Sequence, residues 1–130
     1  MKDVLIVYYS KNDSTKKMAR SIARGIESVD SITSTVRTVD SDTYKDSDDI
    51  IVSKDELEKC SGMIIGSPTH FGNMASPLKA FLDNTSQEWF NGTLENKLGG
   101  VFTSSSSMHG GQESTLLTMM VPLIHHGMII

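Results

Sequence analysis

The sequence predicts an α/β fold in which helices cover both faces of a doubly wound parallel sheet. Three observations support this prediction: short apolar segments recur along the chain, helical apolar patterns separate them, and loops rich in Ser, Thr and Gly follow them. This alternation is typical of parallel sheets, whose strands need long crossover connections. A chain of 130 residues suits one domain, so we expect residues 1–130 to form a single unit.

Composition and charge narrow the class of protein. The chain has 12 Lys and Arg against 16 Asp and Glu, which argues against a surface for nucleic acid or for anionic membranes. We see neither a signal peptide nor an apolar stretch long enough for a transmembrane helix. Cys60 is the single cysteine and cannot form an internal disulfide, so we expect a cytoplasmic protein without structural bridges.

The first third of the chain reads as strand, helix and strand. Residues 3–9 (DVLIVYY) are almost wholly apolar, as expected of a central strand buried on both faces. The spacing of apolar residues over 18–26 predicts a helix that ends near Gly25 or Ser28. Residues 32–39 alternate between polar and apolar, which is typical of a half-exposed edge strand.

The middle of the chain carries two helix starts around another strand. Ser53 and Glu56 have the spacing of a capping box and predict a short helix. Residues 62–67 read as a buried strand. Ser76 as N-cap, with Pro77 at the first helical position, predicts the next helix.

The last third repeats the pattern. Residues 98–103 predict a further buried strand, and residues 112–126 predict a helix that Pro122 should kink or shift. Gly127 suits the residue after a helix, so a fifth strand should begin at Met128. The helix is expected to turn four apolar residues inward: Leu116, Met120, Leu123 and Ile124.

Three loops are the places where chemistry is expected, because ligands bind beyond the carboxyl ends of the strands in such sheets. Residues 10–15 (SKNDST) offer donors at a helix N-terminus, which suits either a phosphate or an ordinary helix cap. This loop lacks the glycines and the Lys-Ser/Thr ending of a nucleotide-binding P-loop. In residues 67–74, the exposed ring of Phe71 suggests a planar ligand or packing on the following helix. Residues 103–113 are long and donor-rich, like a flexible loop or a ligand-binding one.

Five segments in order carry a family resemblance: VLIVYYS, GSPTHFGNM, FLDNTSQEW, GGVFTSSSSMHGGQE and HHGM. Together they resemble the flavodoxin-like NAD(P)H:quinone oxidoreductases of the WrbA type over nearly the whole chain. The resemblance implies a flavodoxin-like fold with strand order 2-1-3-4-5 and FMN as cofactor. It also implies hydride transfer from NAD(P)H to quinones and a homo-oligomer, either a dimer or a tetramer.

The resemblance also assigns site residues. Those implied to bind FMN are Ser10, Lys11, Asn12, Asp13, Ser14 and Thr15 at the phosphate, Pro68, Thr69, His70, Phe71 and Gly72 at the ring, and Ser104, Ser105, Ser106, Ser107 and Gly110 at its polar edge. His125 is implied to lie near the flavin, and Trp89 to help form a substrate pocket assembled across subunits. We expect no metal site, since the adjacent His125 and His126 would point about 100° apart on a helix.

The sequence departs from the family pattern in several places. Asn12 stands where a tyrosine is typical, Asp13 where a glycine is usual, and His70 where an arginine is common. These changes bear on NAD(P)H affinity more than on FMN binding. Family members also continue through a completed fifth strand and a last helix. We therefore expect an incomplete fifth strand, and either a second copy covering the exposed surface or a longer natural protein.

Three alternative functions follow from the same pattern. A one-electron flavodoxin carrier would show no quinone-dependent oxidation of NAD(P)H, and a non-catalytic remnant would keep the fold without FMN. A phosphoacceptor receiver domain shares the strand order but needs an Asp after the third strand, where this chain has Ser67 and Pro68. We therefore set the receiver domain aside.

Overall fold

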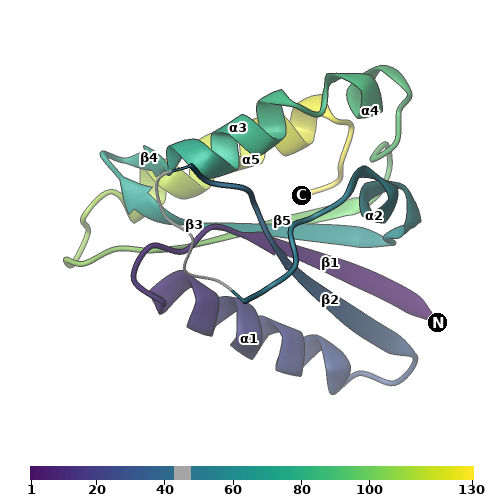
Figure 1. Ribbon diagram of the computed structural model, residues 1–130, viewed down its shortest axis with the longest axis horizontal. Helices are drawn as coiled ribbons and strands as arrows, with labels where there is room; N and C mark the ends of the chain where they lie inside the picture. The colour runs from purple at the N-terminus through teal and green to yellow at the C-terminus, as the bar shows by residue number, and fades with distance from the viewer. Residues whose placement is uncertain (43–47) are drawn as a thin grey trace.

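The computed structural model describes residues 1–42 and 48–130, in which a central sheet lies between two helical layers (Figure 1). Strand β1 pairs in parallel with β2 and β3, and β3 pairs in parallel with β5. The resulting order β2-β1-β3-β5 matches the predicted one, and β2 forms the predicted edge. The strands are β1 (Lys2–Tyr8), β2 (Ile32–Thr38), β3 (Gly62–His70), β4 (Asn73–Met74) and β5 (Leu98–Ser104).

Helices cover both faces of the sheet, as predicted. Helix α1 packs on one face, where Ala19 and Ala23 bury against Ile6, Tyr8 and Phe102. The larger core lies on the other face, beneath α2, α3 and α5. None of the described helices is both long and apolar enough to cross a bilayer. The helices are α1 (Ser14–Glu27), α2 (Lys54–Lys59), α3 (Ser76–Asp83), α4 (Ser86–Phe90) and α5 (Gln112–His125).

The chain after α5 begins to add a fifth position to the sheet. The amide of Met128 donates to Leu123 O at 3.1 Å and that of Gly127 donates to Ile124 O at 2.9 Å, with Gly127 at a φ of 79°. This is a Schellman ending, which needs a left-handed residue and therefore favours glycine. Ile129 then forms a parallel bridge with Leu98, so the predicted fifth strand starts beside β5.

Helix α5 faces the core differently from the prediction. Its fully buried residues are Thr115, Met119 and Leu123, so the prediction is confirmed at Leu123, whereas Leu116 and Met120 are half-buried and Ile124 is 58% exposed. The predicted stripe was rotated by about one residue because this helix is apolar on most sides, so its periodicity gives a poor phase. A threonine can face inward here because Thr115 Oγ1 donates to Gly111 O within the same chain segment, at 2.9 Å.

Two local predictions also need correction. The segment predicted as a loop after β3 is a hairpin: β3 runs through His70, and β4 pairs back with it. Phe71 and Gly72 form its turn with φ of 53° and 74°, the positive values that tight hairpin turns require. Helix α3 has Ala75 rather than Ser76 as its N-cap. By contrast, the capping box of Ser53 and Glu56 is present as predicted.

The contact between Gly66 of β3 and Phe102 of β5 provides a test of the packing. A Cβ at Gly66 would lie 2.0 Å from the Phe102 ring, so Gly66→Ala should lower the free energy of unfolding by about 1–3 kcal/mol, the cost of overpacking a core. Adding Phe102→Leu should restore part of the loss. Gly25→Ala is the matched control, since a Cβ there meets no described residue within 4 Å and should stabilise α1. Urea denaturation measures the free energy of unfolding of all three variants. Equal effects of the substitutions at Gly66 and Gly25 would contradict the packing described.

Candidate functional site

The three predicted loops meet at one cavity of about 240 Å³ beyond the carboxyl ends of β1, β3 and β5. The carboxyl ends of neighbouring parallel strands lie at the same edge of the sheet, which explains why segments so distant in sequence converge. We call this cavity the loop cradle. Its walls are Lys11, Asn12, Ser14 and Thr15 from the first loop, Pro68, Thr69 and His70 from the second, and Ser104, Ser105 and Ser106 from the third.

The first loop presents the N-terminus of α1 to the cradle. The amide of Lys16 donates to Ser10 Oγ at 3.2 Å, and that of Lys17 donates to Asp13 O at 2.9 Å. The first turn of α1 has no acidic residue, and the carboxylate at its positive end is that of the N-cap, Asp13. Asp13 itself is the N-cap, with a left-handed φ of 68° and no capping bond from its side chain.

Hydroxyl bonds tie the loops to one another. Thr15 is buried, and its Oγ1 lies 3.0 Å from Ser104 Oγ. Thr103 Oγ1 donates to Ser67 O at 2.7 Å and lies 3.1 Å from Thr69 Oγ1. The cradle is therefore a set of hydroxyl and amide groups held in place by strands, with Lys11 at its wall.

Some predicted residues border the cradle rather than line it. Phe71 is fully exposed at the tip of the hairpin, where its ring is presented to solvent. Gly72 shares that turn, and Gly110 donates to Ser107 O at 3.3 Å on the outer part of the third loop. Asp13 stands at the helix start beside the lining residues.

Trp89 and His125 do not line the cradle. They border a second cavity of about 280 Å³ between the end of α3, α4 and the C-terminal end of α5. The cradle lies at the other end of α5, which by its length is about 20 Å away. Trp89 is 56% exposed, and its Nε1 donates to His125 O at 2.9 Å. Within one chain, the two predicted catalytic residues therefore lie far from the predicted cofactor residues.

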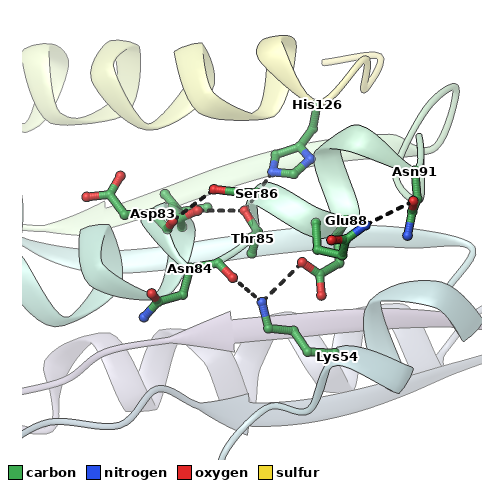
Figure 2. Close-up of polar contacts among 10 residues, drawn as sticks. Lys54, Asp83, Asn84, Thr85, Ser86, Glu88, Asn91 and His126 are labelled. Carbon is green, nitrogen blue, oxygen red and sulfur yellow. Dashed lines mark hydrogen bonds and ion pairs between the residues drawn. The ribbon is translucent and has the colours of Figure 1, made fainter.

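Sequence reasoning missed the polar network that surrounds this second cavity (Figure 2). Helix α4, which carries Trp89, is not predicted from the sequence, because five residues give too short a pattern. His126 is 9% exposed, with Nε2 2.8 Å from Thr85 Oγ1. Burial lowers the pKa of His126, the charge of Glu88 raises it, and the charge of Lys54 lowers it. The HH pair was the available signal, but the sequence does not show which of its members is buried.

Two other features carry none of the predicted site residues. A cavity of about 530 Å³ lies between α3 and the segments 40–42 and 51–54, beyond the end of β2. Cys60 is buried, and burial raises the pKa of its thiol, so it remains protonated and unreactive near neutral pH.

The fold and the cradle define a flavodoxin-like protein, with a cavity at the edge where the crossovers change direction. The model of one family, NADPH-dependent FMN reductase, matches residues 2–130, and the chain belongs to this family. Two curated relatives are each described as an NAD(P)H dehydrogenase (quinone). The one from Solidesulfovibrio magneticus is 38% identical over 98% of this chain and 70% of its own length. The one from Syntrophobacter fumaroxidans is 40% identical over 98% of this chain and 69% of its own length.

Solved structures agree with these relatives. A flavodoxin, WrbA-like protein from Agrobacterium tumefaciens superposes with a TM-score of 0.83 at 27% identity, covering 99% of this chain and 76% of that protein. A flavodoxin from the domain Archaea superposes with a TM-score of 0.75 at 26% identity, covering 98% of this chain and 76% of that protein. The family resemblance and the fold class predicted from the motifs are therefore confirmed.

The conformation of Asp13 generates a prediction about anion binding. Asp13→Gly should relieve a left-handed residue, with a gain below the about 1–2 kcal/mol of most L-residues because Asp tolerates this region, and remove a carboxylate beside the cradle. We expect greater stability and tighter binding of FMN. Asp13→Asn separates the two effects, because Asn tolerates the left-handed region and removes only the charge. Urea denaturation and FMN titration measure them, and weaker FMN binding by both variants would contradict this assignment of Asp13.

Proposed function

We propose that this protein is an FMN-dependent oxidoreductase that transfers hydride from NAD(P)H to quinones. The observation that carries the proposal is the convergence of three donor-rich loops at one edge of a flavodoxin-like sheet. The names of the curated relatives support the reaction, and membership of the FMN reductase family supports the cofactor.

The donor set of the cradle fits FMN. Lys11, the hydroxyls of Ser14 and Thr15 and the N-terminus of α1 suit a phosphate, because anions bind where free amides meet positive charge. The hydroxyls of Thr69 and Ser104 to Ser106 suit the polar edge of a flavin ring. Phe71 stands beside this edge as an aromatic contact for a planar group.

When bound, FMN would supply the two-electron chemistry that passes hydride from NAD(P)H to a quinone. The residues of the chain bind and orient the cofactor and the substrates. Thr103 donates its hydroxyl hydrogen to Ser67 O, so the Thr69 hydroxyl donates to Thr103 and offers a bound flavin an acceptor held in place by the strands. Protonation of the reduced quinone to the hydroquinone requires a donor, and His125 is our candidate.

The proposal includes an oligomer. Trp89 and His125 lie at the opposite end of α5 from the cradle, so both reach a flavin only if a second subunit presents them. Their position beside one another on the surface supports a shared role in the substrate pocket. We also place the protein in the cytoplasm, in keeping with its single cysteine and its use of reduced nicotinamide.

The proposed reaction predicts a defined stoichiometry. FMN-loaded protein should oxidise NADH or NADPH only when a quinone such as benzoquinone is added, with equal amounts of nicotinamide oxidised and hydroquinone formed. Absorbance of the nicotinamide and chromatography of the hydroquinone measure the two. Flavin binding without quinone-dependent oxidation would favour the electron carrier, and a colourless protein after incubation with FMN and desalting would favour the remnant.

The phosphate role of the first loop has its own test. Thr15→Val should weaken FMN binding by about 1.5–3 kcal/mol, the contribution of a hydrogen bond to a charged group. Thr15→Ser keeps the hydroxyl and serves as the control. Riboflavin lacks the phosphate, so its affinity should be unchanged by Thr15→Val. If riboflavin binding falls as much as FMN binding, Thr15 supports the loop through Ser104 and does not contact the phosphate.

A further inference from the structure

We infer that His126 is a positioning residue, which holds Trp89 in place by fastening the start of α4 to the end of α5 through Thr85. The inference concerns the second cavity and rests on the proposed function for the role of Trp89 in quinone reduction. It assigns a use to the second histidine of the HH pair, which the family resemblance leaves without one.

The hydrogen bonds determine which ring nitrogen of His126 carries the proton. Thr85 Oγ1 donates its single hydrogen to Leu82 O at 2.6 Å. It must therefore accept from His126 Nε2, which lies 2.8 Å away and carries the hydrogen of the neutral ring. His126 Nδ1 is then an unprotonated acceptor that is buried without a partner among residues 1–42 and 48–130. The site therefore buries an imidazole with one unsatisfied polar atom, a cost that a purely apolar residue would avoid.

This bond is one of two that join α4 to α5. The second is the bond from Trp89 Nε1 to His125 O, only one residue from His126. From the opposite side, Lys54 Nζ donates to Asn84 O and pairs with Glu88 at 3.2 Å (Figure 2). Helix α4 has five residues and buries none of them, so beyond the buried Thr85 at its start packing holds it only weakly. Its orientation, and that of the Trp89 ring, therefore depends on these polar bonds.

The same arrangement makes the attachment sensitive to pH. A second proton would place a charge and an unpartnered N–H donor in a buried site, which favours release of the ring to water. Because burial lowers the pKa of folded His126 below its ordinary 6.5, the attachment is intact above that pH and is lost as the pH falls toward the folded pKa. The charged or titratable groups around this site are Glu88 on α4, Lys54 on α2, Lys79 and Asp83 on α3, His125 on α5, and Glu95 beside Gly127.

Trp89 is the only tryptophan, so its indole N–H gives one signal in a nitrogen–proton NMR spectrum of the FMN-loaded protein. In His126→Leu this signal should move upfield, and its proton should exchange about threefold to tenfold faster, the fold-change for losing one net hydrogen bond. Quinone turnover should fall by about tenfold at unchanged FMN content, as for a misplaced substrate contact. The signal of the native protein should also shift below pH 6.5.

His126→Gln is the conservative rescue, because its uncharged amide N–H can replace Nε2. It should restore both the indole signal and turnover while abolishing the pH dependence. Thr85→Val should reproduce the effects of His126→Leu, and Thr85→Ser should not. The inference is overturned if the indole signal is unmoved in folded His126→Leu, if His126→Gln behaves like His126→Leu, or if the signal moves while turnover does not. Absence of turnover in the native protein would instead overturn the proposed function, and the indole signal would still decide whether His126 holds α4.

Discussion

The parallel register of β1, β3 and β5 is the constraint on which the rest of the structure depends. Tyr8, Gly66 and Phe102 are aligned across the three strands, so the residues that follow them leave the sheet at the same level. Gly66 is part of this constraint, since a larger residue would meet the Phe102 ring that fills the space toward α1. The loop cradle is thus a consequence of strand pairing. The strands bring the three loops together, and the hydroxyl bonds hold the loops in place.

Features encoded by local pattern could be predicted from the sequence. The apolar run of β1, the alternation of β2 and the Ser53 capping box each report a single physical preference, and each was found where expected. The phase of α5 could not be predicted, because a helix apolar on most sides is oriented only by what packs against it. Helix α4 was missed for a related reason, since polar bonds to Lys54 and His126 stabilise it rather than its own five residues.

The candidate site, too, could be predicted from the sequence only in part. Loops that follow strands were recognisable from composition, and the structure brings them together at one cavity. That Trp89 and His125 would share a separate cavity depends on the length and direction of α5, which motif order alone does not contain. Helix α5 therefore acts as a spacer, with its first turn at the cradle and its last turn at the surface that the resemblance assigns to substrate.

The hairpin of β3 and β4 has a consequence for the thermodynamics of binding. Its turn fixes the backbone of Phe71 in a left-handed conformation while the ring remains entirely in water. A planar molecule that stacks on this ring would bury apolar surface on both partners without breaking any packing inside the protein. Association at this edge would then carry a negative change in heat capacity, and its ordering cost would be limited to the two side-chain torsions of one phenylalanine.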